Sequence, residues 1–300
     1  MNILNKLTIR QLKMNKQRTI VTIIGVILSC ALMVGIGLLF SSVQRNMVDS
    51  IVKYNGDYHT SFEDVSKKDL SLVENNVKVK NYARRSLEMD AVRYGSETDE
   101  TDYFHIYTMN QEYQDSFREL KGRLPKNGNE ILVAQRIMKT KNPQLKIGDT
   151  ITLKIGEFLP MEDDSLSEYE AESSEPKFQE QGEKTFKIVG TYVGDAYGNY
   201  FQGYIGSMYI GGNMSENASS TVYITYKNLR DTYPESEHLA EQLHKTKTSD
   251  DGMYSGLNYN QEYLSLNGNS RYQNYNFTLI AIVAFILTLI SIACIVVIYN

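Results

Sequence analysis

The sequence predicts a membrane protein in which two transmembrane α-helices with stalk extensions flank an α+β extracytoplasmic domain. Two apolar runs, Thr19–Ser42 and Phe277–Tyr299, contain no Asp, Glu, Lys, Arg or His. As helices rising about 1.5 Å per residue, both are long enough to cross a hydrocarbon core of roughly 30 Å. The polar stretch between them, residues 43–276, contains short runs of β-branched and aromatic residues that are typical of strands.

The N-terminal residues 1–18 predict a cytoplasmic amphipathic helix that lies in the membrane interface. They contain five basic residues and no acid, and positive charge beside a span stays on the cytoplasmic side. A simple charged flank is the alternative. The first apolar run (19–42) is longer than a signal-peptide core and lacks a cleavage site, so we expect it to be retained as transmembrane helix 1. The second run, 277–299, is then transmembrane helix 2, and residues 43–276 lie outside a bacterial cell membrane.

Cysteine usage agrees with a bacterial membrane protein. The two cysteines, Cys30 and Cys294, both fall within the apolar runs, and the extracytoplasmic region has none. A eukaryotic secreted domain of this size usually contains disulfides. We therefore expect a bacterial protein, of Gram-positive origin.

Helical spacing continues beyond the first apolar run. Val43, Met47 and Ile51 recur every four residues, which predicts a stalk that extends the membrane helix until Asn55-Gly56-Asp57 breaks it. A second stalk, Tyr263–Tyr275, leads into the second run and is interrupted at Asn267-Gly268-Asn269.

Between the stalks, the pattern predicts an α+β domain with two possible subdomains. The β-branched and aromatic runs that we expect to be strands are 103–107, 150–155, 185–189 and 221–226. The segments that we expect to be helices are 111–120, 134–139 and 236–244.

Residues 157–183 form an acidic segment with ten acids against one lysine. Such a segment of one charge sign is unlike a packed core, and we interpret it as a solvated, disordered insertion in a hairpin. The alternative is a surface that recruits cationic peptides or metal ions, with Glu162, Asp163 and Asp164 at its centre.

Tyrosine is unusually frequent, with 22 in the chain. One run rich in glycine and tyrosine extends from Thr191 to Gly212. Its tyrosines could form an adaptable substrate or partner surface, or they could be core and edge residues of a strand-rich domain. These residues are Tyr192, Tyr197, Tyr200, Tyr204 and Tyr209.

Motifs of common catalytic sites are absent from the sequence. It has no Gly-x-x-x-x-Gly-Lys-Ser/Thr phosphate loop, no His-Glu-x-x-His and no Gly-x-Ser-x-Gly elbow. We therefore expect no enzyme activity, no catalytic residue, no cofactor, no metal ligand and no nucleic-acid partner.

Four ordered motifs resemble those of FtsX/MacB-type ABC transporter permeases, including the MacB-like core domain. They are Gly122-Arg123-Leu124-Pro125, Asn129-Glu130-Ile131-Leu132-Val133, Leu145-Lys146-Ile147-Gly148-Asp149-Thr150-Ile151 and Phe186-Lys187-Ile188-Val189-Gly190-Thr191-Tyr192. Asn258-Tyr259-Asn260 before the second run is similar to permeases from Gram-positive bacteria. The resemblance gives a structural role to Gly122, Arg123, Pro125, Glu130, Gly148, Asp149 and Gly190.

The resemblance implies a function in transport. Such permeases form homo- or heterodimers in the lipid bilayer and pair with a separate cytoplasmic ABC ATPase. They act by mechanotransmission to expel a peptide, antibiotic or lipophilic substrate, in some cases with a cell-wall or membrane-fusion partner. Family members continue into further spans, so we expect this chain, which stops at Asn300, to be a fragment. The alternative is a two-span sensor or scaffold, including FtsX-like regulation of a cell-wall hydrolase, without transport.

Overall fold

The computed structural model describes residues 16–94, 101–117, 120–135, 137–138, 144–159, 177–193, 205–214, 219–249 and 253–271, with isolated positions 10, 14, 285, 288 and 292. The chain divides into two compact units. One comprises Met1–Val48 with Ser270–Asn300, and the other comprises Asp49–Asn269.

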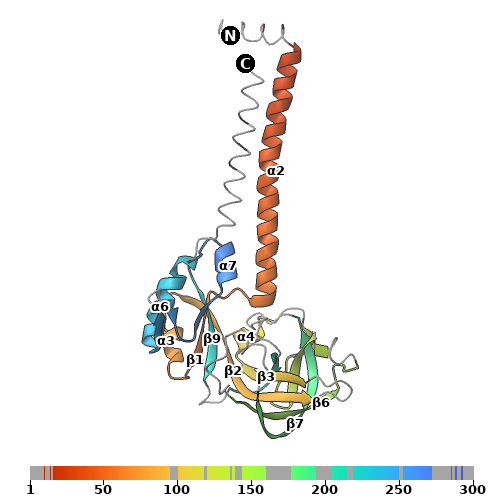
Figure 1. Ribbon diagram of the computed structural model, residues 1–300, viewed down its shortest axis with the longest axis vertical. Coiled ribbons are helices and arrows are strands. Elements are labelled where there is room, and N and C mark those ends of the chain that lie inside the picture. Colours follow the sequence, from red (N-terminus) through yellow and green to blue (C-terminus); the bar gives the residue numbers. More distant parts are fainter. Residues whose placement is uncertain are drawn as a thin grey trace. The chain divides into compact units, whose positions relative to one another are not determined.

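The first long element is helix α2, Lys16–Asn55, which contains the first apolar run (Figure 1). It ends where predicted, because Gly56 adopts a φ of 85° and its N–H donates to the Val52 carbonyl at 3.2 Å. The predicted helical continuation through Val43 and Met47 is therefore confirmed. In the part of the chain that the structure describes, no helix is both long enough and apolar enough to cross a membrane. The second run, 277–299, and most of the leader, 1–18, lie outside the described residues.

The unit Asp49–Asn269 is built mainly from strands. In chain order its elements are β1 (Thr60–Val65), α3 (Leu70–Glu74), β2 (Val79–Tyr94), β3 (Thr101–Met109), α4 (Gln111–Gln114), β4 (Lys121–Gly122), β5 (Glu130–Ala134), β6 (Thr150–Phe158), β7 (Phe178–Tyr192), β8 (Ile205–Ile210), β9 (Ser220–Tyr226), η2 (Leu229–Asp231), α6 (Thr232–Gln242), β10 (Lys247–Ser249), β11 (Met253–Tyr254), β12 (Leu257–Tyr259) and α7 (Gln261–Leu266).

Six of these strands close into a barrel. The ring of paired strands runs β2–β3–β8–β5–β7–β6 and returns to β2, with parallel pairs at β3–β8 and β5–β7. Apolar side chains that alternate along these strands fill its interior, among them Phe104, Ile106, Phe186, Ile188 and Met208. Closure matters because it leaves few unpaired edges in this part of the domain.

The other part of the unit is an antiparallel sheet in the order β12–β1–β9–β2. One face of this sheet is covered by α3 and α6 (Figure 1). Phe62, Val222 and Ile224 point into that core, together with Val73 of α3 and Leu239 of α6. Residues of the same strands that point the opposite way therefore lie on the face without these helices.

Strand β2 belongs to both parts. Its residues 79–86 pair with β9 of the sheet, and residues 85–94 pair with β3 of the barrel. A separate buried cluster fills the joint between barrel and sheet, and we call it the joint cluster. Its members are Ala83, Met109, Tyr113, Leu132, Tyr192, Tyr209 and Tyr223.

All four predicted strands are present, whereas two of the three predicted helices need correction. The segment 236–244 lies largely within α6. Of 111–120, only Gln111–Gln114 is α-helical, and Asn110 caps it by accepting from the Tyr113 N–H. Of 134–139, Ala134 is a strand residue because its parallel pairing with Tyr192 of β7 holds it extended. The other described residues of this segment, Gln135, Ile137 and Met138, are helical, so the predicted helix begins one residue too early.

The predicted acidic insertion, 157–183, is too wide at both ends. Glu157 and Phe158 belong to β6, and Phe178 to Glu183 belong to β7, which pairs with it. These ends are ordered because the ring of Phe158 packs on Phe178 at 5.5 Å and Lys154 forms an ion pair with Glu180 at 2.9 Å. Glu162, Asp163 and Asp164 lie outside the described residues.

Candidate functional site

The motif segments come together around the C-terminal half of β7, and we call this place the motif junction. Gly122 of β4 pairs with Gly190, and β5 runs alongside β7 from Glu130 to Ala134. The loop before β6 joins them, since Gly148 N–H donates to the Ile188 carbonyl at 2.8 Å. The Ile188 N–H in turn donates to the Asp149 carbonyl at 2.8 Å.

The glycines of the motif junction allow backbones to approach closely. A Cβ on Gly190 would lie 2.5 Å from the Arg123 carbonyl oxygen and 2.8 Å from that of Lys121. Gly122 adopts a φ of 82°, and a Cβ there would meet the Val189 carbonyl oxygen. Gly148, at a φ of 106°, turns the chain into β6. These positions therefore need glycine for steric reasons.

An ion pair fastens the first two motif segments to each other. Arg123 binds Glu130 through two parallel hydrogen bonds, Nη1 to Oε2 at 2.6 Å and Nη2 to Oε1 at 2.5 Å. The Lys126 N–H also donates to Glu130 Oε2 at 2.9 Å, which turns the chain at Pro125. The hydrogen bonds from Arg123, followed by that from the Lys126 backbone, lower the pKa of Glu130 to about 2. The motif junction thus holds the backbones of β4, β5 and β7 together.

The tyrosines predicted as a binding surface divide into two groups. Tyr192 and Tyr209 are 3% and 0% exposed, so the surface interpretation is wrong for them. Their rings face away from the barrel interior into the joint cluster, where other aromatic rings cover them. Tyr197, Tyr200 and Tyr204 lie outside the described residues.

The joint cluster also holds a cation that the sequence analysis did not single out. Arg85 Nη1 donates to the hydroxyls of Tyr113 at 3.4 Å and Tyr209 at 3.5 Å, and these two hydroxyls lie 2.9 Å apart. The guanidinium carbon lies 4.3 Å from the ring centre of Tyr107 and 5.7 Å from that of Tyr223. Burial opposes the charge, but the surrounding tyrosines outweigh it and keep the pKa of Arg85 above its ordinary value.

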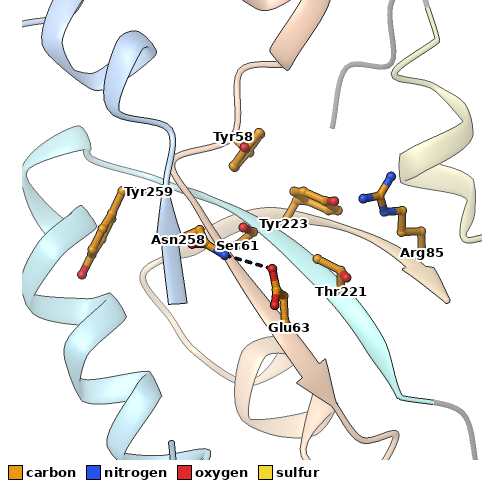
Figure 2. Close-up of a pocket in the computed structure, with 8 residues that line it drawn as sticks. All are labelled: Tyr58, Ser61, Glu63, Arg85, Thr221, Tyr223, Asn258 and Tyr259. Carbon is orange, nitrogen blue, oxygen red and sulfur yellow. Dashed lines mark hydrogen bonds between the residues drawn. The ribbon is translucent and has the colours of Figure 1, made fainter. Parts of the chain in front are cut away.

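Beside Arg85 lies a pocket of about 240 Å³, formed on the face of the sheet opposite α3 and α6 (Figure 2). Cross-strand register explains its position. Ser61 pairs with both Asn258 and Tyr223, and Thr221 pairs with Arg85, so their side chains share one face. The residues that line the pocket are Tyr58, Ser61, Glu63, Arg85, Thr221, Tyr223, Asn258 and Tyr259.

Two of the histidines, His59 and His105, have structural partners. His59 is buried, and its Nδ1 accepts from the Tyr226 N–H at 3.2 Å, which requires a neutral ring at this nitrogen. Burial lowers the pKa of His59 to about 4. His105 Nδ1 lies 2.6 Å from Asp90 Oδ1, and Asp90 Oδ2 accepts from the Phe158 N–H, so this pair links the end of β6 to β2 and β3. Within the described ranges, no group of His, Cys, Asp and Glu could hold a metal ion.

The sequence analysis missed the pocket because its residues are far apart in the chain. Glu63 and Arg85 come from strands β1 and β2, and Asn258 comes from β12 near the other end of the domain. Glu63 and Arg85 belong to no recognisable motif, and Asn258 was noted only as part of the Asn258-Tyr259-Asn260 segment. A basic pair, Arg84-Arg85, was a local signal, because a buried arginine is rare and needs partners.

Comparison with protein families places the fold in a class of extracytoplasmic domains. Residues 19–251 match the model of the MacB-like periplasmic core domain. This match covers more than half of the chain and defines the class, the extracytoplasmic core domain of ABC transporter permeases. The chain belongs to the MacB-like periplasmic core domain family, as its four motifs indicated. No curated protein sequence matches it.

Solved structures of the same kind of domain are similar at low sequence identity. The extracellular domain of the noncanonic ABC-type transporter YknZ from Gram-positive bacteria is 10% identical, with a TM-score of 0.36 over 67% of this chain and 98% of that one. The periplasmic region of MacB from Actinobacillus actinomycetemcomitans is 12% identical, with a TM-score of 0.35 over 66% and 87%. A domain of a permease protein from Porphyromonas gingivalis is 10% identical, with a TM-score of 0.30 over 66% and 78%.

Proposed function

We propose that this chain is the permease subunit of an ABC transporter that acts by mechanotransmission. A separate cytoplasmic ATPase binds and hydrolyses ATP, and the extracytoplasmic domain moves to expel a peptide, antibiotic or lipophilic compound. The observation that carries the proposal is the family match, which begins within α2 and continues through the domain to residue 251.

The chain offers suitable parts for this mechanism. Helix α2 has 40 residues, which at about 1.5 Å per residue is a rod of roughly 60 Å. A rod of this length would carry a displacement from the cytoplasmic side to the domain. In the proposal, the runs 19–42 and 277–299 span the bilayer, the basic leader stays in the cytoplasm, and two permease chains form a homo- or heterodimer.

A genetic experiment tests the dependence on an ATPase. The cell of origin is made deficient in this chain, in the neighbouring ABC ATPase, or in both, and its sensitivity to a panel of antimicrobial peptides and antibiotics is measured. We expect one phenotype for all three strains. We also expect it in a strain whose ATPase has its catalytic Walker-B glutamate replaced by glutamine, because ATP would bind without being hydrolysed.

The outcome that overturns the proposal is also defined. If this chain supplied from a plasmid restores resistance in the strain without the ATPase, it acts without ATP hydrolysis. That result would favour a sensor or scaffold anchored in the membrane. The control is a plasmid that supplies the Val77→Ala variant, which changes one exposed side chain and should complement like the unaltered chain.

A further inference from the structure

The pocket on the β12–β1–β9–β2 sheet is lined by uncharged polar groups from three neighbouring strands (Figure 2). Ser61 comes from β1, Thr221 from β9 and Asn258 from β12. We propose that the pocket binds one ring of a neutral saccharide through its hydroxyl groups. The proposal does not depend on transport, and it assigns the domain a ligand of its own.

Strand register brings these polar side chains to one place. Ser61 pairs with Asn258 on one side and with Tyr223 on the other. Glu63 follows two residues after Ser61 and lines the same pocket, with Thr221 beside it in Figure 2. Neighbouring strands lie about 4.8 Å apart, so groups on three strands can contact different hydroxyls of one small ring.

Two hydroxyls of the lining are available to a ligand. Among the residues that the structure describes, the side-chain hydroxyls of Ser61 and Thr221 have no hydrogen-bond partner. Ser61 is only 5% exposed, and polar groups buried to this extent are usually hydrogen-bonded. A hydroxyl can donate one hydrogen bond and accept two, so a ligand hydroxyl is a suitable partner for each of them.

The rim of the pocket presents a carboxylate and an amide side by side. Glu63 Oε1 accepts from Asn258 Nδ2 at 3.0 Å, the contact drawn in Figure 2. Both side chains are exposed, and this contact orients them before any ligand arrives. A carboxylate can accept about four hydrogen bonds, and the amide keeps its carbonyl oxygen and a second N–H. Neighbouring hydroxyls of a sugar both donate and accept, so they match this mixed pair.

The charges around the pocket favour a neutral ligand. An anion would meet the carboxylate of Glu63. A cation would meet two positive charges, because Lys245 Nζ donates to the backbone carbonyl of Glu63 and Arg85 lies beyond Tyr223. The guanidinium of Arg85 is turned away from Glu63 and is held by tyrosine hydroxyls, so the proposal assigns it no contact with the ligand.

The size of the pocket limits the ligand to about one ring. Its volume of about 240 Å³ is below the roughly 300–1,000 Å³ of pockets that take drug-sized molecules. The rings of Tyr58 and Tyr223, with centres 5.0 Å apart, border it above the polar groups in Figure 2. An aromatic border beside a polar floor suits a sugar, which has an apolar ring face and polar edges.

Direct binding tests the proposal on the full chain in nanodiscs, without any ATPase. Saturation-transfer NMR is run with glucose, galactose, mannose and N-acetylglucosamine. Tetrahydropyran is the control for a ring without hydroxyls, and acetate and methylammonium are the controls for charge. We expect at least one sugar to bind, and the controls to bind about tenfold more weakly or not at all, because they lack the hydroxyls that the pocket would bind.

Two disaccharides, cellobiose and N,N′-diacetylchitobiose, then identify the source of the ring. A disaccharide that binds at least as well as its monosaccharide points to the end of a glycan chain. Binding of the monosaccharide alone points to a free sugar. Both outcomes support the proposal.

Conservative variants locate the site. The double variant Ser61→Ala/Thr221→Val removes both hydroxyls with little change of volume. Glu63→Gln keeps an acceptor for Asn258 but removes the negative charge. Each should weaken sugar binding about tenfold, because hydrogen bonds to the ligand are lost or weakened.

Matched control variants make the same chemical changes outside the pocket. Thr225→Val removes a hydroxyl further along β9, and Glu157→Gln removes a charge from an exposed residue of β6. Neither residue lines the pocket, so both variants should bind sugar as the unaltered chain does. A near-ultraviolet circular dichroism spectrum checks that each variant is folded.

Three results would overturn the inference. One is that no sugar binds at concentrations up to about 10 mM, tenfold above a Kd of about 1 mM. Another is that methylammonium or acetate binds as well as the best sugar, which would make the pocket an ion site. The third is sugar binding that survives both the double variant and Glu63→Gln. Because no ATPase is present, none of these results bears on the proposed transport function.

Discussion

Replacing Gly190 with alanine should destabilise the extracytoplasmic domain more than any other change of a single methyl group in β7. Gly190 is buried in the motif junction, between the backbones of β4 and β5. An added Cβ would lie 2.5 Å and 2.8 Å from two carbonyl oxygens, and 3.0 Å from a methyl carbon of Leu132. The side chain of Leu132 could move, but the two carbonyls belong to a paired strand and its flanking turn.

The expected magnitude follows from this geometry. Overpacking a core by one methyl group costs about 1–3 kcal/mol. We expect Gly190→Ala to lie near the upper value, because the added Cβ meets backbone carbonyls, which move less easily than side chains. In a unit of this size, about 3 kcal/mol corresponds to a fall in Tm of roughly 6–12 °C. Gly182→Ala is the matched control, because it lies on the same strand and a Cβ there meets nothing within 4 Å. Gly182→Ala should raise stability by about 0.4–1 kcal/mol, because alanine lowers the conformational entropy of the unfolded chain.

Thermal unfolding of the full chain in detergent micelles measures both variants. The near-ultraviolet circular dichroism of the buried tyrosines reports the folded domain, since the chain has 22 tyrosines and no tryptophan. If Gly190→Ala and Gly182→Ala have midpoints within about 2 °C of each other, the close approach of backbones at the motif junction is refuted.

Three further predictions concern charge and packing. The pKa of Glu130 is lowered to about 2. Its ion pair therefore stabilises the fold at pH values above the ordinary carboxyl pKa, and this stabilisation is lost as the pH falls toward 2. Arg123→Gln should make the unfolding midpoint depend less on pH between pH 5 and pH 2. The pKa of His59 is lowered from 6.5 to about 4, so the unfolded chain takes up this proton at a higher pH than the folded chain does. Stability should therefore fall as the pH is lowered from 6.5 to 4, and His59→Asn should remove most of this dependence of stability on pH. Phe186→Ala should open a cavity in the barrel and cost about 3–5 kcal/mol in urea unfolding, whereas Val77→Ala, at a residue 77% exposed, should change stability by less than about 0.5 kcal/mol.

Strands with a clear local pattern could be predicted from the sequence, and strands shared between two environments could not. Residues 150–155 and 185–189 alternate between the barrel interior and solvent, so their β-branched and aromatic residues stood out. Strand β2 leaves one sheet and enters the barrel along its length, so its two halves bury different faces. Its charged pair Arg84-Arg85 masked any alternation, and no strand was predicted there.

The helix predictions erred where tertiary pairing overrode local preference. The segment 134–139 has helical residues at 135, 137 and 138, but its first residue, Ala134, completes a parallel ladder with β7. Parallel pairing joins strands that are distant in sequence, so the local sequence does not indicate it. The pocket has the same origin, because Glu63, Arg85 and Asn258 meet through the register of three strands.

The joint cluster explains the position of several tyrosines, because it buries Tyr113, Tyr192, Tyr209 and Tyr223. Tyr113, Tyr209 and Tyr223 fill the space where barrel and sheet share strand β2, and the Tyr113 and Tyr209 hydroxyls hold Arg85 there. Tyrosine suits this place because its ring packs like a core residue while its hydroxyl satisfies a buried cation. A joint packed in this way resists bending between barrel and sheet. The proposed mechanism needs that resistance, because a domain that flexed at its joint would absorb the displacement it is meant to deliver.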